Sequence, residues 1–294
     1  MAKAETGKMY NARIKGVFKI GGLTSTNPIA VGDEVDMQIE DVLEESAMID
    51  TICDRKNYVA RVSPHNKHQH HIIAANLDQS LLFATLKDPK TSQGFIDRFL
   101  ISCEAYHIPA IIVFNKSDLY KQKELDHFAH LQKIYSNIGY QVMLCSVEKN
   151  KGVEEIAALL EGKTTLLSGH SGVGKSTFIN AVFPSLELRT QEVSGWSGKG
   201  MHTTTFAEMF DLPTSGAIID TPGIRELGLV DISKQELAHY FPEMRAQMGN
   251  CHFNNCMHIE EPGCAVKQAL EQGEIAADRY VSYLNILTTM DAAH

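Results

Sequence analysis

The chain has 294 residues, 44% of them hydrophobic and 21% charged, and a formal net charge of −9. This length predicts two or three domains, and the charge argues against a protein that is basic throughout. Its first residues hold no apolar segment of signal-peptide length and no run reaches membrane-spanning length, so we expect a cytoplasmic protein without membrane contact. Structural disulfides are rare in that compartment, so cysteines that cluster there indicate metal binding.

Acidic residues outnumber basic ones along the whole chain: 10 against 9 in residues 1–70, 17 against 14 in residues 71–230, and 9 against 4 in residues 231–294. Contact with RNA would therefore have to use a local basic patch. The candidate patch comprises Arg55, Lys56, Arg61 and Lys67, with His65, His68, His70 and His71 nearby. A solvated loop without a ligand is the alternative interpretation.

Residues 1–70 read as short strands separated by turns. Apolar and polar residues alternate over 12–20, 34–39 and 47–52, and glycine-containing breaks lie between these runs. The pattern predicts a small antiparallel β-barrel. Such a barrel suits oligonucleotide binding, although a fold alone does not establish a function.

In residues 71–230 the sequence pattern changes to alternating strands and helices. The expected strands are 80–86, 110–114, 141–146, 164–168 and 216–220, and the expected helices are 96–106, 121–138, 152–160 and 177–183. This alternation predicts a mostly parallel sheet covered on both faces. The long polar stretch 184–202 is typical of a mobile switch loop.

A glycine-rich stretch with the pattern G-x-x-x-x-G-K-S spans residues 169–176. Its predicted flanks, a strand before it and a helix after it, are the context of a phosphate-binding loop; a chance match in a turn is the alternative. We expect Lys175 to reach the β- and γ-phosphates and act in catalysis, and Ser176 to hold Mg²⁺. Backbone N–H groups and the helix N-terminus would complete the phosphate site. The expected nucleotide-binding residues of this stretch are Gly169, Ser171, Gly172, Val173, Gly174, Lys175, Ser176 and Thr177.

The sequence N-K-x-D at residues 115–118 indicates that the nucleotide is GTP. Asp118 would accept hydrogen bonds from N1–H and the 2-amino group of guanine, which adenine does not offer, and such sites can reject the analogue by about 10⁴-fold. Asn115 would tie this loop to the phosphate loop, Lys116 would cover the ring, and Ser146 would approach the base carbonyl through its backbone N–H. The motif by itself could be a chance turn. The phosphate loop supports its assignment, because the two motifs are expected to bind different parts of one nucleotide.

The sequence D-x-x-G at residues 220–223 supplies the remaining nucleotide contacts. Asp220 would hold Mg²⁺ through water, and the Gly223 N–H would sense the γ-phosphate. We expect Thr204 to close over Mg²⁺, with Thr203 and Thr205 as alternatives.

The position that follows Gly223 is Ile224, where many GTPases place a glutamine that orients water. Our hypothesis is that His202, or a group from a partner, positions the water and that intrinsic turnover is slow. Support of the loop alone is the other role open to His202.

Three cysteines and a histidine lie within fourteen residues near the C-terminus: Cys251, Cys256, His258 and Cys264. Three thiolates and one imidazole match a tetrahedral structural Zn²⁺ site with no open position for catalysis. His252 is an alternative ligand, and buried cysteines without metal are the other interpretation. Residues 231–294 read as helical and could scarcely hold a core unaided, so the metal would contribute folding energy.

Because N-K-x-D precedes the phosphate loop and D-x-x-G comes last, the motif order is that of a circularly permuted GTPase. With these motifs and the cysteine pattern, the whole chain resembles the RsgA/YjeQ family of small-ribosomal-subunit-dependent GTPases. The resemblance implies an OB-fold RNA-binding domain (1–70), a permuted α/β P-loop GTPase domain (71–230) and a helical zinc-binding domain (231–294). It also implies GTP hydrolysis to GDP, stimulated by the small (30S) subunit, and contact with rRNA during late maturation.

Two other functions compete with this interpretation. The barrel and zinc domain could grip RNA while nucleotide only stabilises the fold, or the chain could be an ATP-dependent kinase or ATPase, which N-K-x-D disfavours. We further expect a monomer that does not bind DNA.

Overall fold

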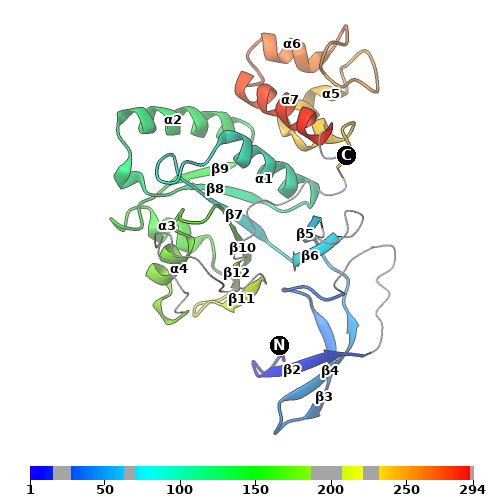
Figure 1. Ribbon diagram of the computed structural model, residues 1–294, viewed down its shortest axis with the longest axis vertical. Helices are drawn as coiled ribbons and strands as arrows, with labels where there is room; N and C mark the ends of the chain where they lie inside the picture. The colour runs from blue at the N-terminus through cyan, green and yellow to red at the C-terminus, as the bar shows by residue number, and fades with distance from the viewer. Residues whose placement is uncertain (16–27, 63–69, 187–206, 221–231, 292–294) are drawn as a thin grey trace, which may run out of the picture. The chain divides into compact units, whose positions relative to one another are not determined.

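The computed structural model describes residues 1–15, 28–62, 70–186, 207–220 and 232–291 (Figure 1). The chain divides into two compact units, Met1–Leu77 and Asp78–His294. None of the helices in the described ranges combines the length and apolar character that crossing a bilayer requires.

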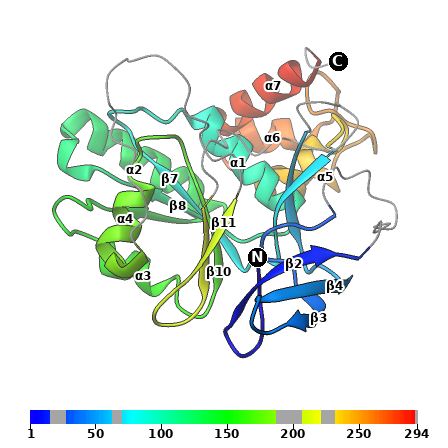
Figure 2. The ribbon, with the colours of Figure 1, turned by 60° about the horizontal axis from the view of Figure 1, so that its bottom comes forward.

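The described residues of the first unit form six strands: β1 (Ala2–Lys3), β2 (Met9–Ile14), β3 (Val35–Asp41), β4 (Ser46–Ile52), β5 (Tyr58–Val62) and β6 (His70–Ala75). Four of them form a sheet in the order β1-β2-β4-β3, and β5 pairs with β6. Figure 2 shows β2, β4 and β3 side by side. The β3–β4 hairpin contains two register shifts, which increase local twist and curl the sheet into half of a barrel. Among the strands described in this sheet, β2 and β4 are parallel to each other, and the other neighbours are antiparallel.

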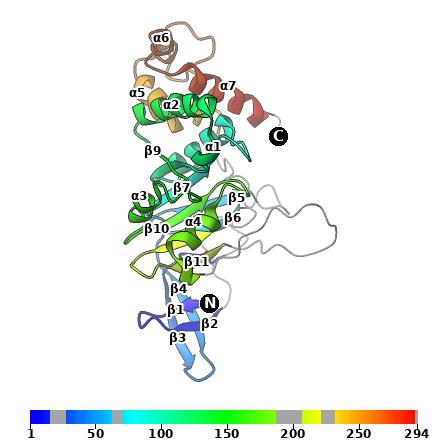
Figure 3. The same cartoon turned by 90° about the vertical axis from the view of Figure 1, so that its left-hand side faces the viewer.

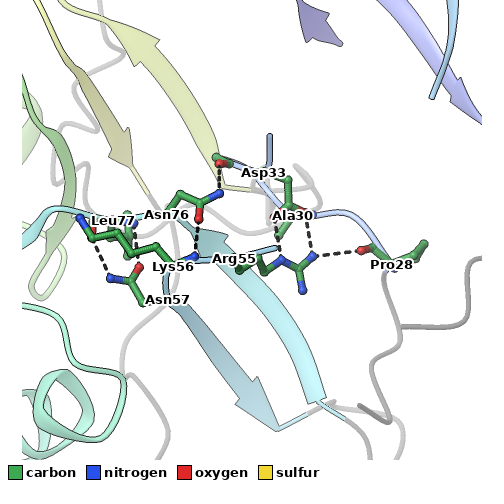
Figure 4. Close-up of polar contacts among 9 residues, drawn as sticks. Pro28, Ala30, Asp33, Arg55, Lys56, Asn57, Asn76 and Leu77 are labelled. Atoms are coloured by element: carbon green, nitrogen blue, oxygen red, sulfur yellow. Dashed lines mark hydrogen bonds and ion pairs between the residues drawn. The ribbon is translucent and has the colours of Figure 1, made fainter. Parts of the chain in front are cut away.

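Buried polar contacts fix the loops of this unit (Figure 4). The guanidinium of Arg55 donates to both carboxylate oxygens of Asp33, at 2.6 and 2.7 Å, and to the Pro28 carbonyl at 3.0 Å. The Asn57 side chain exchanges two 2.8 Å hydrogen bonds with the backbone of Leu77. Because its charge is already paired, Arg55 contributes little to the basic patch expected from the sequence, and Lys67 of that patch lies outside the described residues.

A six-stranded mixed sheet forms the centre of the second unit. Its strands are β7 (Gln79–Ala84), β8 (Ala110–Phe114), β9 (Gln141–Leu144), β10 (Thr164–Ser168), β11 (Glu208–Asp211) and β12 (Ala217–Asp220). They lie in the order β11-β12-β10-β7-β8-β9, and all neighbours are parallel except β11 and β12. The mostly parallel sheet predicted from the alternating pattern is confirmed, with β11 as an added antiparallel edge.

Helices cover both faces of this sheet (Figures 1 and 3). They are α1 (Gln93–Ala105), α2 (Gln122–Asn137), α3 (Val153–Ala158) and α4 (Lys175–Val182), with 3-10 turns at η1 (Ser117–Leu119) and η2 (Pro184–Leu186). Phe114 of β8 packs edge-on against Phe128 of α2, whereas Phe83 of β7 contacts Phe178 of α4. Since Phe83 is in register with Val113 rather than with Phe114, α2 and α4 lie on opposite faces.

Short helices follow in the C-terminal part of this unit: η3 (Leu237–Tyr240), α5 (Pro242–Met248), α6 (Ala265–Glu271) and α7 (Ala277–Asp291). Their shared core includes Phe241, Met244, Val266 and Tyr283, and Ile101 of α1 joins it. Tyr283 of α7 therefore packs in a core that helices of the C-terminal part share with α1.

Candidate functional site

Three motifs begin at one edge of the central sheet. Asn115 follows the last residue of β8, Gly169 follows the last residue of β10, and Asp220 ends β12. Because β8, β10 and β12 point the same way, their carboxyl ends lie along the same edge. Ligands of open α/β sheets bind at this edge.

Glycines are required in the phosphate loop because other chain atoms approach them closely. Gly169 and Gly174 have φ values of 133° and 97°, in the region that only glycine adopts readily. A Cβ on Gly169 would lie 2.3 Å from the Phe83 carbonyl oxygen, and one on Gly174 would lie 2.3 Å from the Asn115 side-chain nitrogen. The loop is thus held close to the Phe83 carbonyl and the Asn115 side chain just before α4 begins.

Lys175 starts α4 and folds back over the loop. Its ammonium donates to the carbonyls of Gly169 at 2.7 Å and His170 at 3.2 Å. Desolvation lowers the pKa of Lys175, and the nearby charge of Asp220 acts in the opposite direction. A half-buried cation is poorly solvated, so its electrostatic attraction to a bound phosphate is stronger than that of an exposed lysine.

Asn115 joins the N-K-x-D loop to the phosphate loop. Its side-chain nitrogen donates to the Val173 carbonyl at 2.9 Å, and its side-chain oxygen accepts from the Val147 N–H at 3.3 Å. The side chain is 2% exposed, so both bonds form away from water. This is the link between the two loops that the motif predicts.

Asp118 lies in η1, where the Ser146 hydroxyl donates to its carboxylate at 2.5 Å. The Ser146 backbone N–H donates instead to the Lys151 carbonyl at 2.9 Å. The atom expected to approach the base is therefore already engaged in a turn, and Ser146 acts on this loop through its hydroxyl. Lys116 adopts a left-handed conformation with φ of 61°, which turns the chain between Asn115 and Asp118.

Only some of the residues expected to hold Mg²⁺ are among the described residues. Ser176 lies in the first turn of α4, with Thr177 after it, and Asp220 lies at the end of β12. The other residues predicted here, His202, Thr204 and Gly223, lie outside the described residues.

The four metal-ligand candidates converge in the C-terminal part. The ligand atoms of Cys251, Cys256, His258 and Cys264 all lie within 4.8 Å of one another, and His252 is not in this group. The His258 Nδ1 atom is 3.4 Å from the Cys264 sulfur and 3.7 Å from the Cys251 sulfur. Separations of this size suit ligands around one Zn²⁺, because Zn–S and Zn–N bonds measure about 2.3 and 2.0 Å.

Desolvation, together with the neighbouring thiols of Cys264 and Cys251, raises the pKa of the Cys256 thiol to about 12, and a backbone hydrogen bond from His258 acts in the opposite direction. A bound cation would reverse this effect, since metal ligation requires the thiolate. Two tyrosines of α7 hold the ligand loop: Tyr280 donates to the His258 carbonyl at 2.6 Å, and Tyr283 donates to the Met257 carbonyl at 2.8 Å. The Cys3His cluster thus fits a structural metal.

Comparison with known families decides the affiliation, because the model of the RsgA GTPase family matches residues 52–230. The chain belongs to the RsgA GTPase family.

Members of the RsgA family match almost the full chain. The RsgA protein of Cytophaga hutchinsonii, named a small ribosomal subunit biogenesis GTPase, is 53% identical over 291 residues, which cover 99% of this chain and 95% of that protein. The RsgA protein of Christiangramia forsetii is 50% identical and covers 97% of this chain and 91% of its own length.

Solved structures agree with this assignment. YjeQ from Thermotoga maritima superposes with a TM-score of 0.78 at 35% identity, over 97% of this chain and 91% of that chain. YloQ, described as a circularly permuted GTPase, gives 0.74 at 31% identity, over 99% of this chain and 89% of that chain. The permuted motif order inferred from the sequence is thus shared with a solved structure.

Sequence reasoning missed a buried ionic network between α1, α5 and α7 of this RsgA family member. Arg279, with a side chain 1% exposed, lies 2.5 Å from Asp97 and 2.7 Å from Glu243, and its guanidinium lies over the Phe241 ring. The Tyr135 hydroxyl donates to the same Asp97 oxygen at 2.7 Å. No spacing signals this network, since Arg279 is 182 positions from Asp97.

Proposed function

We propose that the chain hydrolyses GTP to GDP and phosphate and that its nucleotide state gates attachment to the small ribosomal subunit during late maturation. The observation that carries this proposal is the hydrogen bond from Asn115 to the Val173 carbonyl, which joins a guanine motif to a phosphate motif. One guanine nucleotide can occupy both motifs only if they are adjacent. The GTPase family to which the chain belongs agrees with that activity.

In this proposal, different residues bind different parts of the nucleotide. Asp118, oriented by Ser146, accepts from the guanine edge, and the backbone of residues 169–177 with Lys175 binds the phosphates. Mg²⁺, held by Ser176, Asp220 and Thr204, would neutralise charge on the β- and γ-phosphates. Gly223 would sense the γ-phosphate and His202 would orient water.

The proposed partner is the 30S subunit with its rRNA, because the full-length relatives carry the name small ribosomal subunit biogenesis GTPase. The curled sheet of the first unit and the Cys3His segment, with one Zn²⁺, would be the parts that contact rRNA. We propose that the protein acts as a monomer in the cytoplasm, without DNA or membrane partners.

The test is phosphate release from GTP and from ATP, measured alone and with purified small or large subunits. We expect GTP turnover to rise with small subunits and ATP turnover to remain at background. Turnover at background under all conditions would instead favour an RNA-binding module that nucleotide only stabilises. Equal turnover of ATP and GTP would favour an ATPase and refute the role of Asp118.

A further inference from the structure

The segment between β7 and α1, residues 85–92, belongs to none of the nucleotide motifs, yet it contacts the guanine loop directly. The Leu86 N–H donates to the Tyr120 hydroxyl at 2.9 Å, and that hydroxyl donates to the Asn115 carbonyl at 2.7 Å. Alongside, the Lys116 ammonium donates to the Asp88 carbonyl at 2.6 Å. Tyr120 is 9% exposed and Asn115 is 2% exposed, so the hydroxyl bridge is shielded from water.

The same part of the chain also contacts the phosphate loop. Pro89 lies near Gly172, because a Cβ built on that glycine would be 3.7 Å from Cδ of Pro89. Three residues beyond this segment, the Phe95 ring of α1 stacks on the His170 ring, with centroids 3.9 Å apart and planes 30° apart. Residues 85–95 therefore contact the loops expected to bind the two ends of the nucleotide.

Internal bonds make this segment a defined turn. The Thr91 N–H donates to the Thr85 carbonyl at 2.7 Å, and the Thr85 N–H donates to the Thr91 hydroxyl at 3.0 Å. Thr85 is fully buried and Thr91 is 2% exposed. Buried and mutually bonded groups of this kind keep a loop in one conformation.

We propose that residues 85–95 set the separation between the guanine loop and the phosphate loop, with Tyr120 as a positioning residue for guanine recognition. The inference rests on the proposed role of residues 115–118 in binding guanine. Tyr120 acts through Asn115 and does not itself contact the nucleotide. Desolvation raises the pKa of the Tyr120 hydroxyl to about 12, so it remains a donor at neutral pH.

The test is Tyr120→Phe in the full chain, which keeps the ring and removes the bridge, leaving the Leu86 N–H and Asn115 carbonyl without this partner. We expect the Kd for GDP, measured by displacement of a fluorescent GDP, to rise about tenfold, equivalent to about 1.4 kcal/mol. The Kd for IDP should rise less, because inosine lacks the amino group that Asp118 accepts from, and the preference for GDP should fall about threefold. In GTP hydrolysis with small subunits, KM should change more than kcat.

Tyr140→Phe is the matched control. Its hydroxyl donates to Glu104 at 3.0 Å, it is also 9% exposed, and it lies at the amino end of β9, away from the nucleotide edge. We expect it to bind GDP and IDP as the wild type does. Thr91→Val is a second variant, which loosens the turn and changes no residue of the guanine loop. It should raise both Kd values, that for GDP more than that for IDP, as Tyr120→Phe does.

If Tyr120→Phe does not fold, the GDP and IDP affinities of Thr91→Val test whether residues 85–95 position the guanine loop. Wild-type GDP affinity in the variant that folds, or an equal weakening for GDP and IDP, would overturn the positioning role. A wild-type protein that binds neither nucleotide would instead contradict the proposed function, so the two failures are distinguishable.

Discussion

The buried charge of Arg279 leads to a prediction about stability, because its ion pairs join C-terminal helices to α1 of the central sheet layer. Arg279→Met removes a cation that lies 2.5 Å from Asp97 and 2.7 Å from Glu243 and leaves two buried carboxylates without it. Removing one partner of a buried pair costs about 3–5 kcal/mol. Domains are stable by about 5–15 kcal/mol, so we expect a loss of about a fifth of the stability or more.

The measurement is urea unfolding followed by circular dichroism, with Arg245→Met as the matched control. Arg245 lies 2.9 Å from Glu104 and also joins α5 to α1, but its side chain is 50% exposed. Exposed pairs contribute about 0.2–1 kcal/mol, so the control should unfold close to the wild type. Equal losses in the two variants would refute the reasoning from burial.

A rescue variant separates charge from packing. Asp97→Asn and Glu243→Gln, combined with Arg279→Met, remove all three charges while nearly keeping their volumes. We expect this triple variant to recover more than about half of the loss, because an uncompensated buried charge is the main cost of the single change. A triple variant less stable than Arg279→Met would contradict this account.

Three further predictions concern the two ligand sites. Lys175→Ala should lower kcat/KM for GTP at least about a hundredfold in a phosphate-release assay, because it removes the phosphate cation; activity within threefold of wild type would exclude that role. Asp118→Asn should weaken GTP and favour XTP, whose 2-oxo group can accept from the new amide, and competition between the two nucleotides measures this; an unchanged preference for GTP would contradict it. Native protein should contain one Zn²⁺ per chain by elemental analysis, and Cys264→Ser, or a chelator, should release it and lower the unfolding temperature, whereas wild-type protein purified without zinc would refute the site.

Features carried by neighbouring residues could be predicted from the sequence. The expected strands 110–114 and 164–168 coincide with β8 and β10, since continuous apolar runs bounded by polar turns indicate strands buried on both faces. The four metal-ligand candidates could be found because they lie close together in the sequence. β11 was not predicted, because Glu208–Asp211 is a four-residue edge strand that is mostly exposed.

Contacts between distant segments could not be predicted in this way. The Tyr120 bridge depends on Leu86, 34 positions earlier, and nothing in the composition of either segment indicates that a hydroxyl and an N–H meet. Arg279 is fully buried although it is charged, and this burial depends on Asp97 and Glu243. Tertiary structure alone brings such groups together, so local patterns do not record them.

The position of β10 has a consequence for synthesis of the chain. β10 lies between β7 and β12, yet it is made after β7, β8 and β9. Every residue of β7 is buried in the finished sheet, so a nascent chain presents an apolar strand with one bare edge until residues 164–168 leave the exit tunnel. Synthesis of the about 80 residues from Ala84 to Thr164 takes roughly 4–16 s at about 5–20 residues per second. During that interval the bare edge of β7 can pair with another polypeptide.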